Sequence, residues 1–462
     1  RQMCIRDSSL GGVNLQLPND AKMIINLFLQ SGYEAYAVGG CVRDSLLKRP
    51  FEDVDITTSA EPAEIISVLE KNNIRYIKTG LKHGTITALV NKKPYEITAF
   101  RRDGDYKDSR HPESVEFVRS LEEDLRRRDF TVNAMAYNAE RGTVDLFGGK
   151  DDLENGIIRA VGNPDKKFKE DALRIMRAMR FASVLGFEIE KETHDALLKN
   201  AWLLKNVSSE RICTELFKLL CGKNALNVLR DYSEVITVVI PELKPAIGCA
   251  QNTPWHCCDV YEHIVRAVDF APNDSMLRLA MLLHDIGKPY VKKTDSSGRD
   301  HFKTHAPVGA VIAEQVLKRL KVSNKVFNDV TALVRWHQSV ADVSGIKIGD
   351  WFVLLGPRLT VDLLDARLAD LKAHNPEKIA DELKKLFLVR EKALQMMSEG
   401  TPWRVCDLKI NGRDLKALGY SGRKLGAVLD EMLLLAANGK IENSRDALLD
   451  YAAHKKTQEP SD

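Results

Sequence analysis

The stretch VGGCVRDSLLKRPFEDVDIT, residues 38–57, decides how the first part of this chain folds. Its apolar runs and turn residues predict a strand, a glycine turn, a short helix and a second strand. Before it, AKMIINLFLQSG predicts a helix that ends at a glycine. After it, EPAEIISVLEKN predicts a helix opened by Ser59 with Pro62 in its first turn. GTITALV and PYEITAF, around the turn NKK, predict a strand pair, so we expect an α+β unit with a mixed sheet and helices.

Two carboxylates stand one residue apart in the predicted strand FEDVDIT. Side chains alternate along a strand, so Asp53 and Asp55 share one face while Val54 and Ile56 share the other. Carboxylate oxygens on one face suit Mg²⁺, and Glu96 in PYEITAF offers a third carboxylate on a neighbouring strand. Magnesium ions held there would activate an attacking hydroxyl and stabilise a leaving pyrophosphate.

The glycine turn in front of these carboxylates suits a phosphate. Gly39 and Gly40 let backbone N–H groups approach a phosphate closely, and Arg43 at the start of the next helix can pair with it. Each feature also has an ordinary explanation, because DxD occurs on exposed strand edges and GG marks many turns. The order of turn, helix and carboxylate strand favours a nucleotide and metal site.

Composition limits the class of protein. The 462 residues are 44% hydrophobic and 29% charged, which is typical of a globular protein with about two to four domains. A net charge of +3 is too small to indicate a nucleic-acid partner by itself. Any basic surface must therefore come from local clusters of lysine and arginine. The eight cysteines include no CxxC pair, which favours free thiols and a cytoplasmic location. We expect neither a signal peptide nor a membrane span, because no apolar run approaches about 20 residues.

Beyond about residue 150 the alternating patterns almost vanish, and the rest of the chain is predicted to be all-α. Segments rich in loop residues interrupt it at 163–167, 241–254 and 397–403. The predicted domains are an α+β head, a helical neck, a histidine-rich body and a helical tail, at residues 20–150, 151–240, 250–375 and 376–462.

Five motifs connect the first half of the chain to a known family. The pattern GGxxRDxxLxxxxxDxDxxT, residues 39–58, resembles the head of the class II tRNA nucleotidyltransferase and bacterial poly(A) polymerase family. Four further segments resemble motifs of that family in the same order: LRRRDFTVNAMAYN (125–138), DLFGGKDDL (145–153), KEDALRIMRAMRFA (169–182) and SSERICTEL (208–216). The resemblance implies a nucleotidyltransferase head, with base selection and RNA binding in the neck.

The resemblance also implies roles for single residues: Arg128 binds the triphosphate, Asp129 binds the ribose, and Asn133 is nucleotide-binding. KEDALRIMRAMRFA predicts one helix, on which Asp171 and Arg174 are three residues apart and point the same way. The Asp171 carboxylate accepts hydrogen bonds and the Arg174 guanidinium donates them. Cytosine and adenine both present an amino donor beside a ring-nitrogen acceptor on the Watson–Crick edge, which this pair matches, whereas uracil and guanine present the reverse. The resemblance implies the same role, although an ordinary surface ion pair would have this spacing too.

Arg177 and Arg180 continue this stripe, where we expect them to meet triphosphate or RNA backbone. The polar segment 99–117 predicts a loop, and in the family a loop here lets the site change from C to A. Its length favours addition of CCA to tRNA from CTP and ATP. Enzymes that add only CC or only A, and poly(A) polymerases, are the alternatives, but the basic, Phe-containing insertion after DxD that marks bacterial poly(A) polymerases is not found.

A second constellation follows in the body, where the order H…HD…H…H…D resembles the HD phosphohydrolase superfamily. The candidate metal ligands are His263, His284, Asp285 and Asp370. A second metal or a phosphate would be held by His305 and His337. Imidazole and carboxylate suit Mn²⁺, Ni²⁺, Fe²⁺ or Zn²⁺, and a bound metal would activate water against a phosphoester. In related tRNA nucleotidyltransferases such domains hydrolyse 2′,3′-cyclic phosphates or 2′-nucleotides.

The tail contains LKALGYSGRKLG, which places Arg423 and Lys424 at the start of a predicted helix. There they could bind backbone phosphates of tRNA and recognise the shape of the RNA rather than its sequence. Helix capping with a solvated basic face is the plainer alternative. We expect tRNA, ATP and CTP as partners, and neither DNA nor a membrane. An HD phosphohydrolase with a degenerate head and a non-catalytic RNA-binding scaffold remain open, although intact Asp53 and Asp55 argue against both.

Overall fold

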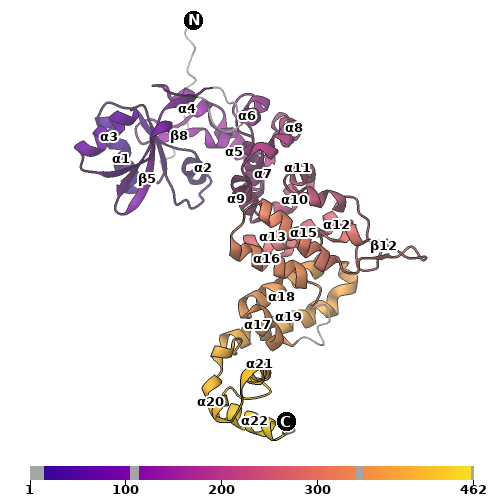
Figure 1. The fold of residues 1–462 in the computed structure, drawn as a ribbon. Helices are drawn as coiled ribbons and strands as arrows, with labels where there is room; N and C mark the ends of the chain where they lie inside the picture. Colours follow the sequence, from indigo (N-terminus) through magenta and orange to yellow (C-terminus); the bar gives the residue numbers. More distant parts are fainter. Residues whose placement is uncertain (1–14, 105–113, 340–346, 459–462) are drawn as a thin grey trace. The chain divides into compact units, whose positions relative to one another are not determined.

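The computed structural model describes residues 15–104, 114–339 and 347–458 (Figure 1). The chain divides into two compact units. The N-terminal unit consists of Arg1–Asn224 and Tyr232–Val239, and the C-terminal unit of Ala225–Asp231 and Ile240–Asp462. Among the described residues, none of the helices has the length and apolar character needed to cross a membrane.

A seven-stranded sheet with the order β3-β4-β5-β2-β1-β8-β9 forms the beginning of the N-terminal unit. Its strands are β1 (Ala35–Val38), β2 (Asp55–Thr58), β3 (Arg75–Gly80), β4 (Thr85–Val90), β5 (Lys93–Ala99), β8 (Met135–Asn138) and β9 (Gly142–Asp145). Strands β2 and β5 run parallel, and the other neighbours run antiparallel, so the predicted mixed sheet is confirmed. A separate antiparallel pair, β6 (Arg101–Asp103) and β7 (Val115–Phe117), lies within the segment 99–117, so the prediction of a loop there is wrong at these two strands. Residues 105–113 between them lie outside the described residues.

Local sequence explains these elements. Strands β4 and β5 join through Asn91 and Lys92, whose φ angles of 50° and 64° are those of a tight hairpin turn. The helices of this part are α1 (Asn19–Gln30), α2 (Gly40–Leu46), α3 (Pro62–Lys71) and α4 (Leu121–Arg126). The prediction that Ser59 opens α3 is wrong: Glu61 is the N-cap and exchanges hydrogen bonds with Glu64, while the Ser59 hydroxyl accepts from the backbone N–H of Glu34.

Helices make up most of the rest of the N-terminal unit. They are α5 (Gly149–Asn155), α6 (Pro164–Glu170), α7 (Leu173–Leu185), α8 (Lys191–Asn200), α9 (Ser209–Leu220) and α11 (Ser233–Val239), with the short strands β10 (Ile157–Ile158) and β11 (Glu188–Ile189). The single helix predicted for KEDALRIMRAMRFA is interrupted, because Asp171 has extended angles of φ −138° and ψ 103°. Its carboxylate accepts a hydrogen bond of 3.1 Å from the backbone N–H of Leu173, which competes with helix continuation.

The C-terminal unit is helical, as predicted, apart from a short pair of strands, β12 (Lys293–Thr294) and β13 (Asp300–His301). Its helices are α10 (Ala225–Asp231), α12 (Val260–Phe270), α13 (Ser275–Leu283), α14 (Lys288–Val291), α15 (His305–Arg319), α16 (Asn324–Trp336), α17 (Ile348–Leu355), α18 (Pro357–Lys372), α19 (Pro376–Ser398), α20 (Gly412–Ala417), α21 (Gly422–Ala437) and α22 (Arg445–Gln458). Helices α17, α18 and α19 share one buried cluster around Phe352 and Leu364, and the last helices pack around Leu415 and Met432 in another.

Candidate nucleotide and metal sites

The two carboxylates of DxD lie on the open side of β2 and of the residues just before it. Asp53 and Asp55 are exposed, while Val54 and Ile56 are 4% and 1% exposed and pack into the core. This alternation follows from the two-residue period of an extended chain. Both carboxylates are therefore available to a ligand from the same side.

Glu96 lies beside Asp55, because β2 and β5 are parallel neighbours with Ile56 paired to Ile97. Asp55 reaches solvent, but protein atoms surround most of its carboxylate. This partial burial raises the pKa of Asp55, and the negative charge of Asp53 raises it further. Burial, and then the charges of Asp55 and Asp53, raise the pKa of Glu96. The three carboxylates thus repel one another, and a bound cation would relieve that repulsion.

The glycine turn adjoins these carboxylates. Gly39 has φ 75°, and a Cβ atom there would lie 3.2 Å from Nη1 of Arg128 and 4.0 Å from Oδ2 of Asp55. A Cβ on Gly40 would be 3.6 Å from Nη2 of Arg43, which is ordinary contact. Only glycine at residue 39 therefore lets the turn, Arg128 and Asp55 come together.

A chain of hydrogen bonds joins four of the predicted nucleotide-binding residues. Arg43 Nη1 donates to Asn133 Oδ1 at 2.6 Å, and Asn133 Nδ2 donates to Asp129 Oδ1 at 3.2 Å. Arg177 donates to Asp129 Oδ2 from Nε at 2.8 Å and from Nη2 at 2.5 Å. Burial opposes ionisation of Asp129, but the charge and hydrogen bonds of Arg177 hold its pKa below the usual range. Asp129 is thus a fixed, ionised carboxylate.

Sequence reasoning missed Glu215, the second of two glutamates in the SSERICTEL motif on α9. It is 6% exposed and lies 2.8 Å from Nε of Arg180 and 4.0 Å from Nη1 of Arg177. The guanidinium carbons of Arg180, Arg43 and Arg177 lie 3.8, 5.1 and 5.5 Å from the ring centre of Phe181. Glu215 and the ring therefore hold three like charges close together.

The two predicted base-reading residues do not contact each other. Asp171 Oδ2 accepts from Arg211 Nη2 at 2.8 Å. Arg174 is 8% exposed and donates to Glu170 Oε2 at 2.7 Å and to two backbone carbonyl oxygens at 2.9 and 3.1 Å. The continuous helix that was predicted to align them is broken at Asp171, so their three-residue spacing no longer fixes their relative orientation.

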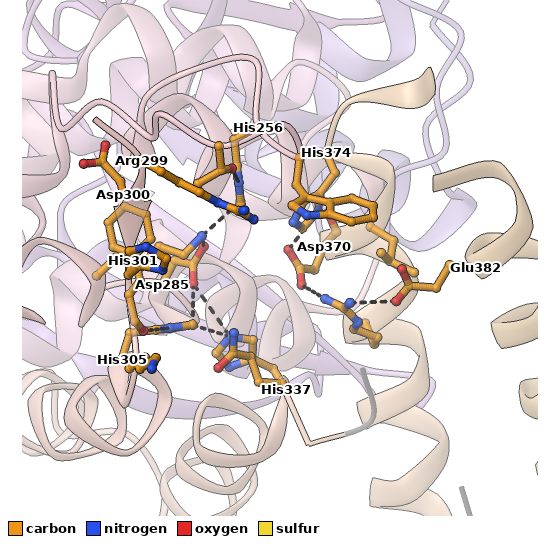
Figure 2. Close-up of a pocket in the computed structure, with 18 residues that line it drawn as sticks. His256, Asp285, Arg299, Asp300, His301, His305, His337, Asp370, His374 and Glu382 are labelled. Carbon is orange, nitrogen blue, oxygen red and sulfur yellow. Dashed lines mark hydrogen bonds and ion pairs between the residues drawn. The ribbon is translucent and has the colours of Figure 1, made fainter. Parts of the chain in front are cut away.

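The C-terminal unit brings the predicted HD residues together beside a pocket of about 510 Å³, which is lined by four of them, Asp285, His305, His337 and Asp370 (Figure 2). All are at most 4% exposed, and they form two groups whose ligand atoms lie within 4.8 Å of one another. One group is His263, His284 and Asp370, and the other is Asp285, His305 and His337. They come from the middle of α12, the end of α13, the start of α15, the end of α16 and the end of α18.

Asp285 stands between the two groups. Its Oδ2 is 3.3 Å from Nε2 of His263 and 3.2 Å from Nε2 of His284. Its Oδ1 is 3.1 Å from Nε2 of His305 and 3.7 Å from Nε2 of His337, and dashed lines mark these two contacts in Figure 2. One carboxylate oxygen thus faces each group, which is the arrangement of a ligand that bridges two cations.

Backbone carbonyls orient three of the imidazoles. Nδ1 of His284, His305 and His337 lies 2.7, 2.8 and 2.8 Å from the carbonyl oxygens of residues 281, 302 and 334. Since a carbonyl only accepts, Nδ1 carries the proton and Nε2 faces the carboxylates. Burial opposes protonation of His284, yet the charge of Asp285 raises its pKa to about 10.

Three further side chains around the two groups, His256, His374 and Lys288, were not predicted from the sequence. His256 and His374 form a third group with His263 within 4.8 Å. Nζ of Lys288 lies 2.7 Å from Asp285 Oδ2 and 3.2 Å from His256 Nε2. The position of Lys288 in HDIGKP, one helical turn after Asp285, could have indicated that it contacts the aspartate. An isolated histidine such as His256 has no sequence pattern that would indicate a place in the site.

These features place the N-terminal unit in a class: a nucleotidyltransferase head that carries carboxylates beside a glycine turn. Three known families match this chain. They are the poly A polymerase head domain at residues 35–159, a probable RNA and SrmB-binding site of polymerase A at residues 186–247, and the HD domain at residues 256–385.

Full-length relatives narrow the class. The CCA-adding enzyme of Lactiplantibacillus plantarum is 36% identical over 95% of this chain and 97% of that enzyme. The CCA-adding enzyme of Geobacillus thermodenitrificans is 35% identical over 94% and 97%. The solved structure of the Bacillus stearothermophilus CCA-adding enzyme in complex with CTP is 29% identical, with a TM-score of 0.69 over 96% of this chain and 98% of that chain. This chain belongs to the family of CCA-adding enzymes, which are nucleotidyltransferases, so the predicted family and fold class are confirmed.

Proposed function

We propose that this protein adds C, C and A to the 3′ end of tRNA, taking CTP and ATP without a nucleic-acid template and releasing pyrophosphate each time. The observation that carries the proposal is the grouping of Asp53, Asp55 and Glu96 beside the Gly39 turn and Arg128. The names of the full-length relatives and the CTP complex of the Bacillus stearothermophilus enzyme support it. We place this work in the cytoplasm, as the free cysteines favour.

Each residue has a part in the proposed transfer. Asp53, Asp55 and Glu96 would hold Mg²⁺, which activates a hydroxyl and stabilises a leaving pyrophosphate. The backbone of the Gly39 turn and Arg128 would bind the triphosphate. Asp129, held by Arg177 and Asn133, would accept from the ribose hydroxyl.

Base selection is proposed for Asp171 and Arg174. To reach a base, Arg174 must leave Glu170, and Asp171 must leave Arg211. The carboxylate of Asp171 and the guanidinium of Arg174 would then form hydrogen bonds with cytosine or adenine. With uracil or guanine these two buried groups would stay without hydrogen-bond partners.

The experiment uses three tRNA substrates: one that lacks the whole end, one that ends in C and one that ends in CC. Each is incubated with CTP alone, ATP alone or both, and the products are sized on a gel. CCA addition extends the first two with CTP and the third with ATP. Enzymes that add only CC would leave the third unchanged, and enzymes that add only A would leave the first two unchanged. Asp53→Ala should abolish all additions, while His284→Ala should retain them.

A second function is favoured by the buried groups of the C-terminal unit, for which we propose metal-dependent hydrolysis of phosphate esters. Oδ2 of Asp285 is buried and faces Nε2 of His263 and His284 as well as the ammonium of Lys288, and the imidazoles and carboxylates gathered here are a donor set that fits transition-metal cations. The two groups would hold two ions such as Mn²⁺ or Ni²⁺, which supply an activated water. With either ion, the protein should cleave 2′,3′-cyclic AMP, and retained cleavage in His284→Ala would refute the assignment.

A further inference from the structure

The mouth of the HD pocket carries three side chains that neither metal group uses. Trp255 lines it from the segment before α12, and Arg299 and Lys303 line it from the β12–β13 region. All three are exposed, and they share the pocket with the ligands Asp285 and Asp370. They are the groups that an entering substrate meets beside the metal site.

Trp255 does not serve as core. Its side chain is 43% exposed, while its carbonyl oxygen accepts a 2.8 Å hydrogen bond from the backbone N–H of Asn375. The backbone is thus tied to the N-cap of α19, and the indole is left open at the pocket. A fixed, open indole offers a flat surface on which an aromatic ring can stack.

The cations of the pocket divide into two kinds. Arg367 pairs with Asp370 at 2.6 Å and Glu382 at 2.9 Å, so its charge is already balanced. The side chains of Arg299 and Lys303, in contrast, make no hydrogen bond or ion pair with any part of the chain that the structure describes. These two are therefore free to bind an anion, and they stand beside a cluster that suits metal ions.

We infer that Trp255 stacks on the base of a nucleoside phosphate ester bound in this pocket, and that Arg299 and Lys303 pair with its phosphate. The inference rests on the phosphohydrolase proposed above. The nucleoside is either free or the last residue of an RNA, since both present the same base and phosphate. For a cyclic phosphate, a water oxygen bonds to phosphorus, one ribose–phosphate bond breaks, and the water proton goes to the released ribose oxygen.

Two substrates with the same cyclic phosphate separate the base from the phosphate: 2′,3′-cyclic AMP and glycerol 1,2-cyclic phosphate, which has no base. Trp255→Ala should raise KM for the nucleotide roughly 5- to 150-fold, as expected for the loss of one stacked base. It should leave KM for the glycerol ester unchanged, and Trp255→Phe should restore much of the loss. Arg299→Ala and Lys303→Ala should raise KM for both substrates.

Trp202→Ala is the matched control, because Trp202 is 60% exposed and belongs to the N-terminal unit. It should change neither KM. Equal effects of Trp255→Ala on both substrates, or no effect on either, would overturn the inference. An RNA oligonucleotide with a 2′,3′-cyclic end distinguishes the two sources: a much lower KM than for the free nucleotide assigns the pocket to RNA ends, and an equal KM assigns it to free nucleotides.

Binding gives a second readout that needs no turnover. Calorimetry with 3′-AMP and Mn²⁺ should show binding to the parent and to Trp202→Ala, and weaker binding to Trp255→Ala. If the parent hydrolyses neither cyclic ester, the proposed phosphohydrolase fails, while this titration still decides on the nucleotide. If 3′-AMP binds the parent and Trp255→Ala equally, the inference fails even where hydrolysis is found.

Discussion

Replacing Gly39 by alanine tests the nucleotide site directly. Gly39 has φ 75° and ψ −130°, a conformation that costs a residue with a Cβ atom about 1–3 kcal/mol. The new Cβ atom would also lie 3.2 Å from Nη1 of Arg128, so the guanidinium must move by a few tenths of an ångström. Because transfer depends on the placement of reacting groups, we expect a loss of about tenfold or more in kcat/KM for CTP.

Gly32→Ala separates placement from backbone strain. Gly32 also has a positive φ, 86°, but a Cβ atom there would have no neighbour within 4 Å. Both variants should lose about 1–3 kcal/mol of the free energy of unfolding, measured by urea denaturation. Only Gly39→Ala should lose activity, measured as the initial rate of CMP addition to tRNA. Equal activity in Gly39→Ala and Gly32→Ala would refute the placement of Arg128 by this turn.

Four further variants test other parts of the molecule. Arg174→Ala should relax discrimination against UTP and GTP while some transfer persists, and rejection as strict as in the parent would contradict base reading by the protein. Arg177→Ala should cost about 1–3 kcal/mol of unfolding free energy at pH 7, because it leaves Asp129 buried without its charged partner. The stabilisation from the lowered pKa of Asp129 is complete above about pH 4 and is lost as the pH falls from there through that lowered pKa, so the difference in urea midpoints should shrink below pH 4. Asp285→Asn should remove both bound Mn²⁺ ions and His337→Ala one of them, as counted by elemental analysis, and equal metal contents would argue against a bridging carboxylate.

Patterns with a strict period or a fixed motif order predicted most of the architecture. The two-residue alternation of Asp53 to Ile56 was sufficient to orient the carboxylates, because a strand with one buried face has little freedom. The HD ligands were found from the motif order, although the bridging position of Asp285 was not, since it depends on how five separate helices pack. Strands β3, β8 and β9 were missed: β8 is a short, fully buried run, which periodicity alone does not distinguish from a helix.

The interruption at Asp171 shows where sequence reasoning failed for a physical reason. Helix propensity and period both favoured one continuous helix over KEDALRIMRAMRFA. A single local hydrogen bond, from the N–H of Leu173 to Asp171, was enough to begin a new helix two residues later. Aspartate is a residue that competes with helical backbone bonding in this way, so an aspartate inside a predicted helix is a position to question.

The resting contacts of Arg174 set the cost that any nucleotide must meet before its base is read. If Arg174 and Asp171 read the base as proposed, a nucleotide must first replace the hydrogen bonds of Arg174 to Glu170 and two backbone carbonyls, and that of Asp171 to Arg211. Hydrogen bonds of charged groups are each worth about 1.5–3 kcal/mol. Cytosine and adenine replace these bonds with equivalent hydrogen bonds to the Asp171 carboxylate and the Arg174 guanidinium. Uracil and guanine present donors to donors and acceptors to acceptors, so they would break the resting contacts without replacing them. Every nucleotide meets the same cost of breaking these resting contacts, so that cost cancels when two nucleotides are compared, and discrimination comes from the open pair. Glu170→Gln, which weakens the resting contact of Arg174 and keeps its shape, should therefore lower KM for correct and rejected nucleotides by a similar factor and leave selectivity unchanged. A large change in selectivity in this variant would contradict a resting contact that acts only as a common cost.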